Sequence, residues 1–199
     1  MTGESEHLGW LLISVSTAGA ANSLRVQVWR KLRSLGGLYL QQSVCLLPDR
    51  PEVARQVRRL LDRVYHQGGT GQALHVELTD AAELAHLIGQ MNAARDAEYA
   101  EVLERLPALR QELADERARG NVTYAEVEES EADLERFRVW LAKIAARDYF
   151  AAPDGQAART AVQDAAAELA AFGEAALHAD APEPAADTVL PRLRVVDQS

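Results

Sequence analysis

Basic side chains are concentrated in one part of this sequence, and their spacing predicts contact with an anionic partner. Between Ser23 and Arg63 there are nine basic and three acidic residues, a formal charge of +6 in a chain of net charge −9, which leaves −15 for the remainder. Lysine and arginine contacts to phosphates supply much of the affinity of proteins for duplex DNA. The residues that we expect to contact DNA lie largely outside the apolar stripe of the first predicted helix: Arg25, Arg30, Lys31 and Arg33.

Three alternatives stay open in this segment. The arginines could instead form a solvated helix face that pairs with the acidic helices downstream. Trp29, beside Arg30, is expected to pack against the neighbouring helix, with stacking on a base or a partner as the alternative. Gln41-Gln42-Ser43 is either a satisfied polar turn, or a place where amides read bases or where two copies of the chain pair along a strand edge.

A second charged group combines one predicted helix with a later dipeptide. Arg95, Asp96, Glu98 and Tyr99 share the helix, and Arg95 and Tyr99 are four residues apart, so they lie on one face. One interpretation is a pocket in which Arg95 binds an oxyanion by charge-assisted hydrogen bonds. The other is a buried ion-pair network that docks the helix onto the sheet. Both interpretations extend to Arg147 and Asp148.

The remaining reactive residue types predict no enzyme, cofactor or metal site. The five histidines have no cysteine, histidine or acidic partner at the spacing of a metal site. Cys45 falls in a predicted core strand, where a thiol is usually an inert small apolar group. The run Gly68-Gly69-Thr70-Gly71 lacks the lysine of a phosphate-binding loop.

The elements that must position these residues follow the order strand, helix, strand, strand, helix, strand. Leu24, Val28, Leu32 and Leu35 recur at helical spacing, and Val53, Val57, Leu60, Leu61 and Val64 do the same. Short apolar runs predict strands over 10–16, 38–41, 43–47 and 73–78. This order predicts an α+β, ferredoxin-like βαββαβ domain over residues 10–79, with both helices on one face of an antiparallel sheet.

A helical extension is predicted over residues 80–178. Asp80 with Glu83 resembles a capping box, and the helix that starts there should kink or end at Pro107. Further helices are expected over 108–119, 126–149 and 156–178. Residues 1–9 are predicted to be a disordered amino-terminal tail, and residues 179–199 a flexible carboxy-terminal tail.

The sequence also predicts a cytoplasmic protein without a membrane segment. Its amino terminus lacks the basic start and the apolar run of a signal peptide, and its apolar runs are too short to span a bilayer. With one cysteine, the chain forms no intramolecular disulfide.

Several blocks of this sequence resemble the amino-terminal domain of the chromate-resistance regulator family, ChrB. They occur in the family's order and cover roughly Trp10 to Phe172: Trp10-Leu11-Leu12, Leu24–Leu32, Gly36–Pro48, Asn92–Tyr99 and Trp140–Phe150. The resemblance implies a regulator that acts on expression of a chromate efflux transporter. Full-length members carry a second, carboxy-terminal chromate-resistance domain, and we expect this chain to stop before it.

From this resemblance we expect a DNA-binding transcriptional regulator, a homodimer, with chromate as a possible effector that Arg95 would contact. The alternative is a non-enzymatic protein-interaction module in oxyanion resistance that does not bind DNA. The domain is also similar to that of CRISPR-associated small nucleases, which carry an Asp just after the first strand. Ser14, Ser16 or Thr17 fills that position here, which argues against a metal-dependent nuclease.

Overall fold

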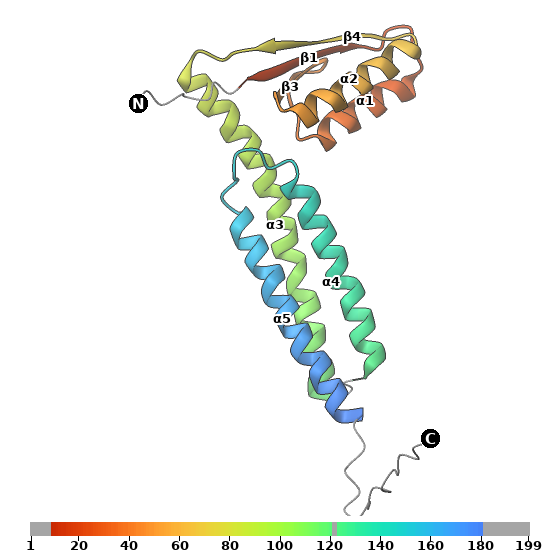
Figure 1. Ribbon diagram of the computed structural model, residues 1–199, viewed down its shortest axis with the longest axis vertical. Coiled ribbons are helices and arrows are strands. Elements are labelled where there is room, and N and C mark those ends of the chain that lie inside the picture. The colour runs from red at the N-terminus through yellow and green to blue at the C-terminus, as the bar shows by residue number, and fades with distance from the viewer. Residues whose placement is uncertain (1–8, 121–122, 181–199) are drawn as a thin grey trace, which may run out of the picture.

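An α+β domain stands at one end of a long three-helix bundle (Figure 1). The computed structural model of the chain describes residues 9–120 and 123–180. The domain consists of β1 Trp10–Ser16, α1 Asn22–Ser34, β2 Leu38–Gln41, β3 Val44–Pro48, α2 Pro51–His66 and β4 Thr70–Val76. The predicted fold class, a ferredoxin-like domain followed by a helical extension, is confirmed.

The sheet is antiparallel throughout, with its strands in the order β2-β3-β1-β4. Alternate residues of a strand point to opposite faces of the sheet. Leu11 and Ile13 of β1 therefore pack with α1 and α2, while Trp10 and Leu12 belong to the apolar cluster on the other face. β1 is apolar at successive positions because both of its faces are covered.

α1 and α2 lie side by side on one face of the sheet (Figure 1). The apolar stripe predicted for each helix is buried against the sheet. Between α1 and β2 the chain passes so close to β3 that a Cβ at Gly37 would lie 2.5 Å from the Cys45 Sγ atom. Glycine is therefore required at this crossing.

β4 begins earlier than the sequence predicted, at Thr70 and not at Ala73. A Cβ at Gly69 would lie 2.8 Å from a methyl carbon of Val64, and one at Gly71 would lie 2.8 Å from a methyl carbon of Leu61. These glycines thus let the strand start directly beneath α2.

The extension consists of α3 Ala81–Arg119, α4 Tyr124–Ala145 and α5 Gly155–Asp180, which pack along one another (Figure 1). They share an apolar core that includes Leu106, Leu134 and Phe172. The predicted start of α3 is correct: the Asp80 carboxylate accepts hydrogen bonds from the backbone N–H groups of Ala82 and Glu83.

Of the two outcomes predicted at Pro107, a kink or an end of the helix, the end is wrong, because α3 continues through the proline to Arg119. Proline removes one backbone hydrogen bond and disfavours the turn before it. On either side of Pro107, however, the side chains of Leu106, Leu109 and Leu113 are buried in the bundle core. Their burial keeps both halves in one helix.

The predicted extent of α4 to Tyr149 is also wrong, because the helix ends at Ala145. Tyr149 packs against the cluster beneath α1 and α2, and Phe150 packs against the cluster on the opposite face of the sheet. A continuing helix would carry these two aromatic residues past the domain. The chain leaves the helix so that both can pack, half-buried, against the domain.

α3 connects the two apolar cores. Near its amino terminus, Leu87 and Met91 pack on Trp10 and Leu46 of the sheet, while its later turns enter the bundle core. At about 1.5 Å per residue, its 39 residues extend for about 58 Å. The second face of the sheet, which the sequence left without a cover, is thus partly covered by the start of the extension.

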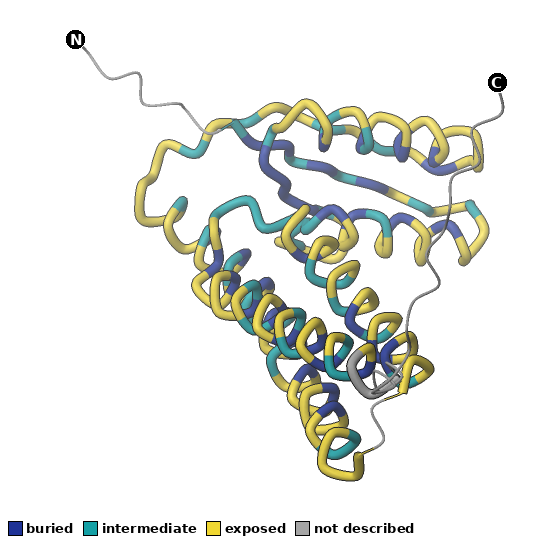
Figure 2. Tube along the Cα trace, turned by 60° about the horizontal axis from the view of Figure 1, so that its bottom comes forward, coloured by how far each residue is buried: buried dark blue, intermediate teal, exposed yellow. Residues whose placement is uncertain are grey.

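Figure 2 shows buried residues along the inward sides of the helices and along the inner strands, with exposed residues on the outward sides. The predicted tails lie outside the described residues, apart from Gly9 at one end and residues 179–180 of α5 at the other. In the described ranges, no helix combines the length and the apolar character needed to cross a membrane.

Substitution of Pro107 by alanine tests the continuity of α3. Pro107 is exposed, so Pro107→Ala restores a helical hydrogen bond without disturbing the core, and we expect a gain of about 1–2 kcal/mol in the free energy of unfolding. Urea unfolding followed by circular dichroism measures it. Ala108→Gly, at the next exposed position, should lower stability by about 1 kcal/mol. A loss of stability in Pro107→Ala would show that the proline ends the helix.

Candidate functional site

The exposed sides of the neighbouring helices α1 and α2 carry seven arginines, against the two exposed acids Glu52 and Asp62. Lys31 of α1 and Gln56 of α2 join the helices through a hydrogen bond of 2.6 Å between Nζ and Oε1. We define the basic surface by the exposed arginines of the two helices: Arg25, Arg30, Arg33, Arg55, Arg58, Arg59 and Arg63.

The basic surface is not neutralised by the acidic extension. Among the residues that the structure describes, its one ion pair joins Arg55 to Glu52 of the same helix, at 3.2 Å. Six arginines of the extension, by contrast, are paired with carboxylates of the extension: Arg95, Arg110, Arg119, Arg136, Arg138 and Arg147. Among the described residues, the acids of the downstream helices therefore form no ion pairs with these arginines, contrary to the alternative considered from the sequence.

Trp29 lies on the same exposed side of α1, and its predicted packing against the neighbouring helix is wrong. Its side chain is 46 % exposed, and the Arg33 guanidinium lies 5.0 Å from its ring centroid. Arg25, Trp29 and Arg33 are four residues apart, so they form a row along the helix. This row flanks the apolar stripe that faces the sheet.

The row borders a cleft of about 910 Å³ at the end of β1. Ser14, Ser16 and Thr17 line it on one side, and the Gln41-Gln42-Ser43 turn lines it on another, with Arg25, Trp29 and Arg30 contributed by α1. It thus combines hydroxyl, amide, aromatic and cationic groups. These segments are separate along the sequence, and the fold brings them together.

Lys31 differs from the other three predicted DNA-binding residues. It is half-buried, with its amino group held by Gln56, whereas Arg25, Arg30 and Arg33 are exposed. It also lines a smaller pocket where the domain meets the extension.

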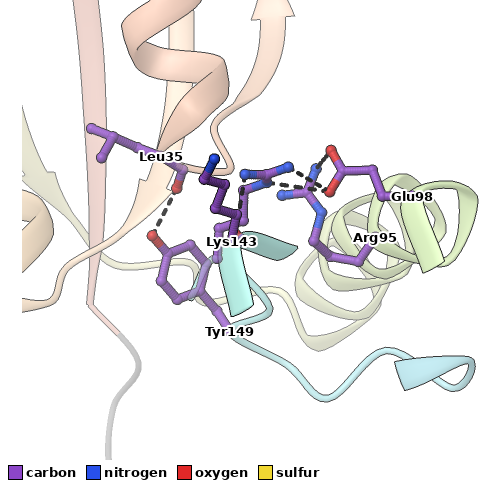
Figure 3. Close-up of polar contacts among 6 residues, drawn as sticks. Leu35, Arg95, Glu98, Lys143 and Tyr149 are labelled. Atoms are coloured by element: carbon purple, nitrogen blue, oxygen red, sulfur yellow. Dashed lines mark hydrogen bonds and ion pairs between the residues drawn. The ribbon is translucent and has the colours of Figure 1, made fainter. Parts of the chain in front are cut away.

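The second predicted group is brought together across α3 and the loop after α4 (Figure 3). Arg95 is 7 % exposed, and its Nη2 donates to Glu98 Oε1 at 3.0 Å. Arg147 donates to the other oxygen of Glu98 from Nε at 3.2 Å and from Nη2 at 2.9 Å. One carboxylate therefore bridges two guanidinium groups.

The other predicted members of this group bond to the same loop. Tyr99 Oη donates to Asp148 Oδ2 at 3.0 Å, and Asp148 Oδ1 accepts from the Ala152 N–H at 2.9 Å. Asp96 accepts from the Asp154 N–H at 2.9 Å. The arrangement is an ion-pair network, but it docks α3 onto the loop after α4 and not, as predicted, onto the sheet.

Burial and these bonds shift the ionisation of two members of the network. Burial lowers the pKa of Arg95, while the nearby Glu98 carboxylate acts in the opposite direction. Burial, together with the hydrogen bond to Asp148, raises the pKa of Tyr99 to about 12. Tyr99 therefore stays protonated and remains a hydrogen-bond donor at neutral pH.

Tyr149 fastens this loop to the domain, a role that the sequence analysis missed. Its hydroxyl donates to the Leu35 carbonyl at 2.7 Å (Figure 3), and its own carbonyl accepts from Arg50 Nη2 at 3.1 Å. The Arg50 guanidinium also lies 5.1 Å from the Tyr149 ring centroid. The signal in the sequence was an aromatic pair, Tyr149-Phe150, directly after Arg147-Asp148.

Cys45 lies in the domain core beneath α1. Burial raises the pKa of its thiol to about 12, so the reactive thiolate is not formed at neutral pH. Within the described ranges, no three His, Cys, Asp or Glu side chains gather so as to hold a metal ion.

Comparison with known proteins relates this chain to one family. The model of the family described as "Protein ChrB, N-terminal" matches residues 25–182. Protein ChrB of Cupriavidus metallidurans is 29 % identical over 111 residues, which make up 56 % of this chain and 34 % of that protein. The match thus spans about a third of the length of that relative. No solved structure matches the chain.

Removal of the shared carboxylate tests the network. Glu98→Gln removes the negative charge that offsets the repulsion between the guanidinium groups of Arg95 and Arg147. We therefore expect the free energy of unfolding, measured by urea titration, to fall by about 2–3 kcal/mol. Glu135→Gln is the matched control, because Glu135 pairs with Arg138 at the surface and should matter by less than about 0.5 kcal/mol. Equal effects of the two substitutions would contradict a structural role for Glu98.

Proposed function

The chain belongs to the ChrB family, and from that premise we propose that it is a DNA-binding regulator linked to chromate resistance. In this proposal the basic surface of α1 and α2 binds the phosphates of duplex DNA. The link to chromate resistance comes from the family, while the DNA-binding role is argued from the residues of the chain.

The observation that carries the proposal is the separation of charge between the two parts of the molecule. Six arginines of the extension have carboxylate partners within the extension, whereas the basic surface has one ion pair among the described residues. Exposed arginines without carboxylate partners repel one another, which disfavours the folded state unless an anion is nearby. A phosphate backbone supplies such anions at regular spacing.

The cleft beside α1 supports the same role. Trp29 and the Gln41-Gln42-Ser43 turn lie next to Arg25 and Arg30, so aromatic and amide groups adjoin the proposed phosphate contacts. Amides and aromatic rings contact bases and sugars, while arginines fix the position of the protein on the backbone.

We also propose that this role is not enzymatic. The positions at the end of β1 carry Ser14, Ser16 and Thr17, none of which can act as the carboxylate of a metal-dependent nuclease. The proposal further includes a homodimer. β2 forms an edge of the sheet with Leu40 43 % exposed, which leaves a strand edge that a second copy could pair with.

The experiment is a mobility shift with a duplex that carries the promoter of a chromate-transporter operon, titrated with salt. We expect Arg30→Glu combined with Arg59→Glu to weaken binding at least tenfold. The slope of log affinity against log salt should become shallower by about 2, since each lost phosphate contact contributes about 0.9.

The matched control is Arg136→Glu combined with Arg138→Glu, which makes the same charge change on exposed arginines of α4. It should leave affinity within about twofold, because those arginines are far from the basic surface along the chain and already paired. If neither variant differs from the parent, or if the parent fails to bind at low salt, the DNA-binding proposal is lost. The protein-interaction module without DNA binding then becomes the better account.

A further inference from the structure

The cleft at the end of β1 is large enough to hold a ligand of its own. Its volume of about 910 Å³ lies near the upper end of the range for small-molecule sites, about 300–1,000 Å³. A stacked base pair presents only its groove edges to a protein. A paired duplex therefore meets the rim of such a hollow, and a group that stands free of the double helix is needed to fill it.

The walls of the cleft are apolar and aromatic. Val15 and Leu32, which belong to the domain core, line it together with the rings of Tyr39 and Trp29. The Trp29 side chain is almost half exposed, and the Arg33 guanidinium lies over its ring. An exposure of this size leaves ring surface on which a second planar group can stack. Unpaired bases gain much of their affinity for proteins by stacking on such rings.

The amides of the cleft are free to bind a ligand. The Ser43 carbonyl accepts from the Val15 N–H at 3.1 Å, which holds the turn against the end of β1. In the part of the chain that the structure describes, the side chains of Gln41 and Gln42 have no hydrogen-bond partner. An amide both donates and accepts, as the exposed edge of an unpaired base requires.

Tyr39 adds a hydroxyl donor to the lining of the cleft. Burial raises the pKa of this hydroxyl to about 12, against the opposite effect of the nearby Arg33. The hydroxyl therefore keeps its proton at neutral pH and can donate to a ligand.

The charge of the cleft favours an anionic ligand. The lining includes Arg25 and Arg30 and, among the described residues, no carboxylate. A bare inorganic anion would satisfy the arginines but leave the aromatic and amide groups unused. A ligand that uses all three combines a phosphate, a planar ring and an edge of hydrogen-bond donors and acceptors. This is the composition of a nucleotide.

We propose that the cleft binds a single nucleotide whose base is unpaired. The phosphate lies at Arg25 and Arg30, the base stacks on Trp29, and the amides of the turn contact its edge. Such a nucleotide is either free in solution or part of a DNA strand. For a nucleotide within DNA the inference rests on the proposed function, and for a free nucleotide it does not.

Within DNA, the preferred sites are those where a base is already unpaired. Extrusion of a base from an intact duplex costs its stacking and its pairing, so a bulge or an overhang binds with less loss than a paired site. The basic surface then contacts the flanking duplex, while the cleft holds the unpaired nucleotide.

Fluorescence anisotropy with short labelled duplexes tests the site in DNA. One duplex is fully paired, and the other has the same sequence with one extra, unpaired nucleotide at its centre. We expect the unpaired nucleotide to raise affinity about tenfold, which is within the range for stacking of one base on an aromatic side chain.

Trp29→Ala should reduce this preference to within about twofold and leave the salt slope unchanged, because stacking is lost while the phosphate contacts remain. Trp29→Phe should retain most of the preference, because a ring remains. Tyr124→Ala is the matched control, since Tyr124 is an exposed aromatic residue of α4 that does not line the cleft. Gln42→Ala, at an exposed position of the turn, should weaken the preference severalfold and serves if Trp29→Ala disturbs α1.

Isothermal titration calorimetry with deoxynucleoside 5′-monophosphates tests the free ligand, with inorganic phosphate as the reference. Binding that is tighter than that of phosphate and is lost in Trp29→Ala identifies free nucleotides as the ligand. A preference for the unpaired duplex without such binding identifies DNA as the source. Both results support the proposal.

Equal affinity for the two duplexes, together with no monophosphate binding beyond that of phosphate, would overturn the proposal and leave the proposed function standing. A preference that persists in both Trp29→Ala and Gln42→Ala would also overturn it, because the cleft would not be the site. If the chain binds no DNA while a monophosphate binds and Trp29→Ala abolishes that binding, the proposed function fails and the site stands.

Discussion

The second face of the sheet is the constraint on which the rest of the structure depends. With α1 and α2 on one face, Trp10 and Leu46 would be left to water on the other, and α3 covers them with Leu87 and Met91. Because α3 is one continuous helix, this contact also fixes where the bundle stands. The loop after α4 then reaches the domain, where Tyr149 bonds to Leu35. The Arg95 network follows from that placement.

The two parts of the molecule use their charged residues in different ways. In the extension, some ion pairs join two helices, as Arg110 and Glu168 do, and others lie within one helix, as Arg136 and Asp133 do. The charges of the extension therefore balance locally. In the domain, the arginines of α1 and α2 are exposed and mostly lack carboxylate partners among the described residues. A chain of net charge −9 can thus present a basic surface, because its acids are held elsewhere. That surface is where the proposed function places DNA.

Prediction from the sequence succeeded where a short segment carries its own pattern. Three such features were predicted: the apolar stripe of α1, the helix cap at Asp80, and the order of helices and strands along the chain. Each depends on residues that are close together in the sequence. Prediction failed where distant parts of the chain decide the outcome. Pro107 stays helical because the bundle core holds both sides of it, and α4 ends early because Tyr149 and Phe150 pack against the domain.

The sequence by itself determined that Arg95 and Tyr99 share a face and that the basic residues cluster, since both follow from composition and helical spacing. Only the tertiary structure decided their roles. Arg147 and Asp148 lie 49 residues from Glu98 and Tyr99 along the chain, and folding alone brings each pair into hydrogen-bond contact. Folding likewise gave Lys31, which is held between α1 and α2 by its hydrogen bond to Gln56, a different environment from the exposed arginines beside it. Spacing along a helix gives the direction of a side chain, but what it meets depends on segments that no local pattern encodes.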